Sequence, residues 1–187
     1  MTNKSNPLKN QDSILIARCL KHDETAQRQL YVKYRVRWYI LCQRYGKTKF
    51  EADDLLQEGL ISIFNSLHQY DSNKSQFSTW SSRVIVNAAL RYLKKNSWNS
   101  TFSELDMAKN TNSTEVGIQE QLAERELIDL LQKLPTGYRI VFNMYAIEGY
   151  SHKEVSAALE ITIGTSKSQL SKARKMLRTQ LETHLIS

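Results

Sequence analysis

The sequence predicts an all-α protein of two small helical domains joined by a flexible linker, the C-terminal domain being a four-helix unit. Only six glycines and two prolines occur in 187 residues, so little of the turn chemistry of hairpins and sandwiches is present. Apolar residues recur instead at the 3.6-residue helical period, and two capping-box sequences mark helix starts. The expected boundaries are 8–96 for the first domain, 97–117 for the linker and 118–185 for the second domain.

The charge and composition narrow the range of partners. The formal charge of +7 favours an anionic partner such as nucleic acid. No apolar run approaches the roughly 20 residues of a membrane-spanning helix, and the N-terminus lacks a signal-peptide core. We therefore expect a cytoplasmic chain without membrane insertion. Cys19 and Cys42 stand apart from each other and from the four scattered histidines, so no disulfide, metal site or cofactor is expected.

Two helices are predicted before residue 45. Residues 11–21 carry a short amphipathic pattern, and Asp23 is suited to cap the next helix, which runs to about Arg44. From Lys33 to Lys49 the remaining surface holds six basic residues and no acid. The predicted buried stripe of the second helix is Leu30, Tyr31, Tyr34, Trp38 and Leu41.

A third helix combines an apolar face with an acidic one. Thr48 and Glu51 form a T-x-x-E capping box, which predicts a helix from there to about Leu67. Its core face is predicted to be Ala52, Leu55, Leu56, Gly59, Leu60, Ile63, Phe64 and Leu67. The opposite side carries Asp53, Asp54, Gln57, Glu58 and Ile61. The helix dipole favours acids near an N-terminus, but it does not explain the glutamine and isoleucine on this face.

A basic helix without acids is predicted over about 76–95. Arg83, Asn87 and Arg91 recur at four-residue steps along one face. A side chain able to hydrogen-bond base edges therefore lies between cations that can hold phosphates.

The loop before this helix is a candidate for holding single-stranded nucleic acid. Tyr70–Gln76 contains Lys74 and begins with Tyr70, on whose ring a base can stack. Phe77 and Trp80 follow at helical spacing and are expected to pack in the core instead.

The second half of the chain begins with a linker and two helices. Residues 96–117 are rich in Asn, Ser and Thr and lack a sustained period. Periodicity resumes at Ile118, and Pro135 ends that helix and can start the next, which Gly149 terminates. The apolar rows are Leu122, Leu127, Leu130, Leu131 and Leu134 in the first of these helices, and Ile140, Val141, Met144 and Tyr145 in the second.

Residues 150–177 predict a helix-turn-helix. Ser151 and Glu154 form an S-x-x-E capping box, and Thr162 can cap a second helix after a short turn, the spacing that a DNA-reading pair requires. Five basic residues and no acid lie between Thr162 and Leu181, so the outer face suits a phosphate-lined groove. The predicted inner side is Ile163, Leu170, Ala173, Leu177 and Leu181, and the outer side is Thr165, Ser168, Gln169 and Lys172.

These motifs, in this order, resemble bacterial RNA polymerase sigma factors of the sigma-70 family, specifically the extracytoplasmic-function (ECF) subgroup. In the first domain DDLLQE, FSTW and RVIVNAALRYLKK are similar to region 2 of the family. In the second, the stretch from LPTGYRIV to SKARKML is similar to region 4. The resemblance spans nearly the whole chain. It implies an initiation factor, not an enzyme, that gives core polymerase its promoter specificity and nucleates DNA melting.

The resemblance also implies protein partners. Asp53, Asp54, Gln57 and Ile61 match the surface that docks on the clamp helices of the largest polymerase subunit. Many members of the family are held inactive by an anti-sigma factor, which is a further possible partner.

Promoter DNA, duplex and melted, is the remaining implied partner. Arg83, Asn87 and Arg91 match the helix that reads the −10 element, and Tyr70 and Lys74 lie in the loop that captures a base flipped from the melted non-template strand. The residues that match the major-groove face at the −35 element are Lys167, Ser168, Gln169, Ser171, Lys172 and Arg174.

Three residues depart from the family pattern. Glu160 stands where the family usually has Gly in the turn, a position of positive φ at which other residues are costly. Gln169 stands where Arg is frequent, which would exchange a phosphate or guanine contact for a weaker or adenine-directed one. Ser156 replaces the usual Ala at the close helix crossing.

Two other functions are compatible with the helix-turn-helix. A stand-alone DNA-binding repressor or activator would leave the acidic face around Asp54 and the Tyr70 loop unexplained. A recombinase or transposase fragment would need a catalytic serine or acidic constellation, which we do not find in the sequence.

Overall fold

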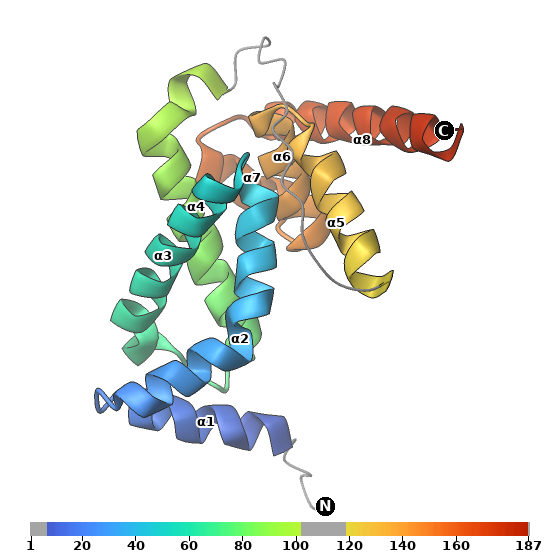
Figure 1. Cartoon of the computed structure of the whole chain (residues 1–187). Coiled ribbons are helices and arrows are strands. Elements are labelled where there is room, and N and C mark those ends of the chain that lie inside the picture. Colours follow the sequence, from blue (N-terminus) through green and yellow to red (C-terminus); the bar gives the residue numbers. More distant parts are fainter. Residues whose placement is uncertain (1–6, 102–118, 187) are drawn as a thin grey trace, which may run out of the picture. The chain divides into compact units, whose positions relative to one another are not determined.

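The computed structural model describes residues 7–101 and 119–186, and within them the side chains of 11–95 and 125–182 (Figure 1). Every regular element in these ranges is helical, which confirms the all-α prediction. Besides the α-helices there are a short 3₁₀ helix, η1, and a π-helix, η2. In chain order the elements are α1 (Pro7–Cys19), α2 (Glu24–Tyr45), α3 (Lys49–Ser66), η1 (Leu67–Gln69), α4 (Phe77–Thr101), α5 (Gln119–Gln132), α6 (Thr136–Phe142), η2 (Asn143–Ile147), α7 (His152–Leu159) and α8 (Ile163–Ile186).

By their contacts the residues form two compact units. The first is made of Met1–Cys42 and Asp53–Ala89, the second of Gln43–Ala52 and Leu90–Ser187. Helices α2, α3 and α4 therefore each contribute residues to both units. Helix α4 continues to Thr101, into the segment predicted as linker, and the rest of that segment lies outside the described residues. The domain boundaries expected from the sequence stay predictions.

Local caps start two of the helices as the sequence predicts. The Asp23 carboxylate accepts a hydrogen bond from the backbone N–H of Ala26 at 3.0 Å, ahead of α2. Thr48 accepts from the N–H of Glu51 at 3.1 Å, ahead of α3. The return bond from the Glu51 carboxylate reaches the N–H of Lys47 at 2.7 Å, one residue before the Thr48 expected for a capping box.

An aromatic cluster forms the centre of the first unit. Phe77 is 1% exposed and lies in the middle of the cluster, 5.2 Å from the ring of Tyr34 and 5.7 Å from that of Trp80. Trp38 is fully buried and donates its indole N–H to the Ser81 hydroxyl at 3.1 Å, which ties α2 to α4. The predicted burial of Phe77 is confirmed, whereas Trp80 is half-buried.

Helix α3 packs closely on α4 through Gly59. A Cβ atom at this position would lie 3.0 Å from the Ile85 side chain, so only glycine allows this approach without a shift. The predicted core face of α3 is largely confirmed. Ala52, Leu55, Gly59, Ile63 and Leu67 are buried, while Leu56, Leu60 and Phe64 are half-buried.

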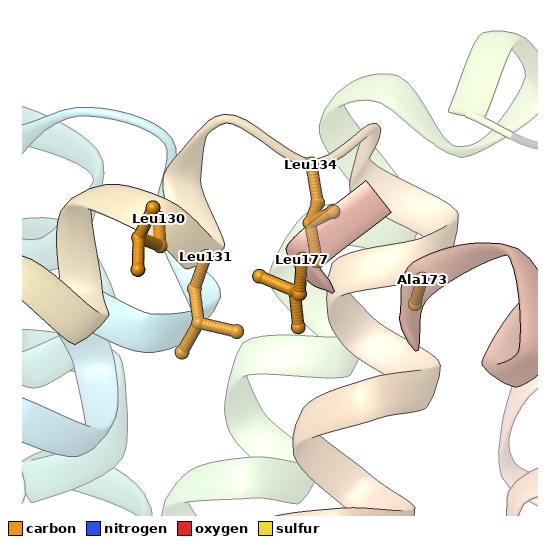
Figure 2. Close-up of a cluster of buried hydrophobic side chains, with 5 residues drawn as sticks. All are labelled: Leu130, Leu131, Leu134, Ala173 and Leu177. Carbon is orange, nitrogen blue, oxygen red and sulfur yellow. The ribbon is translucent and has the colours of Figure 1, made fainter. Parts of the chain in front are cut away.

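Leucines from α5, from the turn after it and from α8 form a hydrophobic core cluster of the second unit. Figure 2 shows Leu130, Leu131 and Leu134 gathered with Ala173 and Leu177, and Tyr138, Phe142 and Met176 pack against them. One prediction for this region is wrong. Leu127 is 44% exposed, although its spacing placed it in the apolar row of α5. The side chain of Leu122 lies outside the described residues.

The helix after Pro135 widens before it ends. Ile140, Val141 and Met144 are buried as predicted, but the last turn, Asn143–Ile147, is a π-helix. Gly149 follows with φ 75, a left-handed conformation that favours glycine. This glycine therefore turns the chain into α7.

Candidate nucleic-acid interface

Helix α7 starts at the capping box that the sequence predicts. The Ser151 hydroxyl accepts from the N–H of Glu154 at 3.2 Å, and the Glu154 carboxylate accepts from the N–H of Ser151 at 2.8 Å. Each bond satisfies a donor that the helix N-terminus leaves unpaired. The entry of the chain into the helix-turn-helix is thereby fixed.

The turn between α7 and α8 contains the strained residue expected at the glycine position of the family. Glu160 has φ 55 and ψ 39, in the left-handed region. The Ser156 hydroxyl donates to the carbonyl of Ile161 at 2.6 Å, and the N–H of Ile161 donates to the carbonyl of Ser156 at 3.1 Å. Thr162 then accepts from the N–H of Thr165 at 3.0 Å and caps α8, as predicted. Ser156, a departure from the family pattern, thus helps to hold this turn.

Helix α8 exposes a basic face. The residues of this face include five of the six predicted to enter a major groove, and all five are exposed. The Lys172 amine lies 5.9 Å from the centre of the Tyr138 ring, and the Arg174 guanidinium lies 6.0 Å from that of Tyr145. The five exposed residues are Lys167, Ser168, Ser171, Lys172 and Arg174.

The prediction that Gln169 lies on this outer face is wrong. Gln169 is 7% exposed, and its Oε1 atom has no hydrogen-bond donor in the described part of the chain. The residue precedes Ala173 by four positions, about 40° around the helix, so it falls on the buried side. This four-residue spacing from Ala173 is the feature of the sequence that indicated a buried Gln169. Conversely, Ile163 and Leu181 were expected on the inner side and are 45% and 47% exposed.

A histidine links α7 to the start of α8. The His152 ring stacks on the Tyr145 ring at a centroid distance of 4.2 Å, and its Nδ1 lies 2.9 Å from the hydroxyl of the buried Ser166. Burial, together with the charges of Lys167 and Arg174, lowers the pKa of His152 below its ordinary value of about 6.5. The neutral ring is therefore the favoured form in the folded protein.

The second basic face lies on α4. Arg83, Asn87 and Arg91 are all exposed and follow one another at four-residue steps of the same helix. No acidic residue occurs anywhere between Phe77 and Thr101. This face can therefore combine phosphate contacts with one amide able to read a base edge.

The loop before α4 is tied to the aromatic cluster. The Tyr70 ring lies 5.3 Å from Phe77 and 5.5 Å from Trp80, and its hydroxyl donates to the carbonyl of Ser75 at 3.2 Å. Burial, followed by nearby carboxylates, raises the pKa of Tyr70. Lys74 follows in a tight turn, and its side chain is 84% exposed. The loop thus presents one half-buried ring and one cation.

The acidic face of α3 is present as predicted. Asp53 and Gln57 are exposed, Asp54 is half-buried and Ile61 is 51% exposed. The pKa of the Tyr39 hydroxyl is raised by burial and by the Asp53 carboxylate, which accepts a hydrogen bond from it. A residue that the sequence reading missed also lies on this face. Phe50 is 76% exposed and precedes Asp54 by one helical turn, a four-residue step that was visible in the sequence.

Other kinds of site find no support within residues 7–101 and 119–186. No group of three or more histidines, cysteines or acids there could hold a metal ion. None of the helices described is long and apolar enough to cross a membrane. Cys19 and Cys42 are both buried, and neither forms a disulfide.

The fold and the basic face of α8 define a helix-turn-helix DNA-binding protein. Comparison with known proteins identifies both halves of the chain more closely. The family model Sigma-70 region 2 matches residues 30–99, and the model Sigma-70, region 4 matches residues 124–177.

Similar whole proteins are ECF sigma factors. The ECF RNA polymerase sigma-E factor of Escherichia coli (strain K12) is 25% identical over 182 residues, covering 91% of this chain and 94% of that protein. The sigma-E factor of Haemophilus influenzae is 24% identical over 183 residues, covering 91% and 95%.

Two solved structures are also similar. One is CnrH in complex with the cytosolic domain of CnrY, with a TM-score of 0.49, 22% identity and coverage of 91% of this chain and 96% of that one. The other is RpoE in complex with the anti-sigma factor NepR from Bartonella quintana, with a TM-score of 0.49, 18% identity and coverage of 83% and 96%.

The chain belongs to the ECF subgroup of the sigma-70 family. It is a non-catalytic factor that directs RNA polymerase to promoters, and sigma factors do so by binding core polymerase and promoter DNA. Of the three functions compatible with the sequence, family membership thus selects the initiation factor.

Proposed function

We propose that three separate surfaces of the chain divide the work of initiation. The first, which we call the docking surface, is Asp53, Asp54, Gln57 and Ile61 on α3, and it binds the clamp helices of the largest polymerase subunit. An acidic face in a chain of net charge +7 supports this, because such a face is unsuited to DNA. The 51% exposure of Ile61 supports a protein partner as well.

The second surface, the −10 surface, contacts the melted promoter. Arg83, Asn87 and Arg91 would read and hold the −10 element, while Tyr70 and Lys74 would receive a base flipped from the non-template strand. The exposure of the three α4 residues and the absence of acids from that helix support this assignment. Capture of a flipped base would stabilise the melted state and thus nucleate opening.

The third surface, the −35 surface, enters the major groove of duplex DNA. It consists of Lys167, Ser168, Ser171, Lys172 and Arg174 on α8. The observation that carries it is the capped recognition helix whose residues from Ile163 to Leu181 include five basic residues and no acid. Each good bidentate base contact would contribute about 1–3 kcal/mol of discrimination.

The proposal includes domains, compartment and regulation. The docking and −10 surfaces belong to a domain of residues 8–96, and the −35 surface belongs to a domain of residues 118–185, with residues 97–117 as the linker between them. The chain acts in the cytoplasm, where bacterial polymerase transcribes. An anti-sigma factor is the further partner we propose, because one protein covering the α3 or α8 face would block polymerase or promoter binding.

Reconstitution with core polymerase tests this function. We expect the purified chain to co-elute with core polymerase and to start run-off transcription from a subset of promoters of its source genome. Alignment of the start sites should reveal shared −35 and −10 elements. The proposal would be wrong if the chain neither co-elutes with core polymerase nor initiates transcription at any promoter. Tight sequence-specific binding by the chain alone, without polymerase, would favour a stand-alone regulator.

A further inference from the structure

His152 is a titratable residue at the junction of η2, α7 and α8, and it belongs to none of the three proposed surfaces. It is the first residue of α7, and its ring stacks on the Tyr145 ring of η2 at a centroid distance of 4.2 Å. Its Nδ1 atom lies 2.9 Å from the Ser166 hydroxyl of α8. All three residues belong to the second compact unit. Because these contacts hold the ring through its face and its Nδ1 atom, Nε2 is the ring atom that can meet a ligand.

Two cations of α8 lie near the same ring. The Arg174 guanidinium lies 6.0 Å from the centre of the Tyr145 ring on which His152 stacks. Lys167 directly follows Ser166, the residue that His152 contacts. After burial, the charges of these two cations are the causes that lower the pKa of His152. Three groups able to carry positive charge therefore meet at one place.

The other groups around His152 do not offset these cations. On α7 itself Lys153 is exposed, and the Glu154 carboxylate accepts from the backbone N–H and the hydroxyl of Ser151 at 2.8 Å each. The Tyr145 phenol carries no charge near neutral pH. Helix α8 contains no acid between Ile163 and Leu181. Positive charge gathered in this way repels itself in the free chain and attracts an anion, so the cluster suits a phosphate.

The proposed −35 complex, on which this inference rests, would bring DNA phosphates to this place. In a helix-turn-helix the second helix enters the major groove while the first helix crosses the DNA backbone. Here the first helix is α7, and His152 is its first residue, where unpaired backbone N–H groups and the helix dipole also favour an anion. Lys167 and Arg174 already belong to the −35 surface.

We propose that His152 forms, with Lys167 and Arg174, a site for one backbone phosphate of the −35 duplex, and that His152 takes up a proton from the solvent when this phosphate binds. Both ring nitrogens of a protonated histidine are donors. The Nε2–H donates to a phosphate oxygen, and the Nδ1–H donates to the Ser166 hydroxyl. The phosphate also neutralises the two cations, which removes the repulsion that opposes protonation. Promoter binding and proton uptake are therefore coupled at one residue.

The coupling has a definite sign. A group that holds its proton more tightly in the complex than in the free chain adds to the affinity at low pH. The added affinity is fully present below the pKa of His152 in the free chain, which is lower than the ordinary value, and it is lost as the pH rises through the pKa in the complex. A ring that served only in packing would give the affinity no such dependence.

The effect of the cations is measured on the free chain, by magnetic resonance titration of the His152 ring. Lys167→Met should raise the pKa of His152, because it removes one of the two charges that lower it. Lys175→Met removes the same charge from another exposed position of α8 and should leave that pKa unchanged. Equal effects of the two substitutions would remove Lys167 from the site.

The phosphate site itself is tested with holoenzyme and a fluorescent duplex that carries the −35 element defined by run-off start sites. Between pH 7.5 and pH 5.5 the affinity of the wild type should rise by roughly fivefold relative to that of His152→Gln, since one proton can contribute at most tenfold per pH unit. Glutamine keeps a hydrogen-bonding side chain beside Ser166 but does not titrate. His152→Phe, which keeps the stacking on Tyr145, is a second variant without a titrating group.

His184→Gln is the matched control, because His184 is the other histidine of the second unit. This variant should keep the pH dependence of the wild type. If both His152 variants also keep it, or if His184→Gln removes it, the proposed site is wrong while the −35 surface stands. If the wild-type holoenzyme binds the duplex at neither pH, the −35 surface is wrong and the site falls with it.

Discussion

Gln169 has a side chain whose amide is suited to base recognition but whose position is buried. Its amide is suited to reading adenine, yet the side chain is 7% exposed and its carbonyl oxygen has no donor in the described residues. A buried polar atom without a partner is costly, so conversion to an apolar side chain removes that cost along with the amide. The side chain thus lies on the packed side of α8 and not on its exposed face.

Gln169→Met is therefore expected to change the free energy of unfolding by less than about 1 kcal/mol, because lost polar contacts are offset by removal of the unpaired oxygen. The base preference at the −35 element should stay that of the wild type. Chemical unfolding and a competition assay against a library of −35 sequences measure both quantities. Gln29→Met, at an exposed position of α2, is the matched control for stability. A changed base preference would return Gln169 to the −35 surface.

His152 should make the helix-turn-helix sensitive to acid. Burial, then the charges of Lys167 and Arg174, lower its pKa in the folded state. A lowered folded pKa means that the unfolded chain binds the proton more tightly. The contribution to stability is therefore fully present above about pH 6.5 and is lost as the pH falls through the lowered pKa.

The comparison of wild type with His152→Phe checks this sign. The phenyl ring can keep the stacking on Tyr145 but does not titrate. The melting temperature of the wild type should fall more than that of the variant between pH 7.5 and pH 5.5. Equal falls in the two proteins would show that His152 is not the group responsible.

At the scale of the element, helix starts could be predicted from the sequence because capping is local. Asp23, Thr48, Ser151 and Thr162 each accept the backbone bond that the spacing predicts. The ends of α2 at Tyr45 and of α3 at Ser66 are also close to the predicted ones, whereas α4 continues to Thr101, past the predicted end near residue 95. The π-helix Asn143–Ile147 has no local signal that we recognised.

Exposure within a helix depends on packing as well as on period. Leu127 has the right spacing for the apolar row of α5 and is nevertheless 44% exposed. Ile163 is the first residue of α8, and the packing that buries Leu170, Ala173 and Leu177 does not extend along the helix to it. A helical wheel gives the angle of a side chain but not the width of the surface that covers it.

Ser151→Ala should loosen α7 by removing one half of its capping box. The expected loss is about 1 kcal/mol of unfolding free energy. The affinity for a −35 duplex should fall as well, because α7 supports the recognition helix. Ser171→Ala, on the exposed side of α8, should cost no stability, since alanine is the better helix former. Equal losses of stability from both substitutions would argue against a role for the cap.

At the scale of the molecule, the sequence alone predicted the order of the functional surfaces but not the contacts of the second unit. DDLLQE, FSTW and the helix-turn-helix are short motifs, so their positions can be read directly. Residues 94 to 104 positions apart are in contact there: Arg44 and Tyr45 contact Arg139, Asn143 and Glu148. No local pattern in the sequence predicts these contacts. The fold class and most exposed candidates were therefore accessible from the sequence, whereas these long-range contacts were not.

The central claim is that polymerase and DNA are bound by different surfaces of one chain. Asp54→Ala combined with Gln57→Ala should weaken binding to core polymerase by at least about tenfold, as expected for loss of central interface contacts. The same double variant should keep the wild-type affinity for a −35 duplex.

Lys172→Ala provides the opposite variant. Loss of one phosphate contact should weaken duplex binding and reduce its salt slope by about one, without affecting the affinity for core polymerase. Parallel titrations of both variants with core polymerase and with duplex DNA are the most direct measurement. We predict that each variant loses one partner and keeps the other; loss of the same partner by both would contradict the division into separate surfaces.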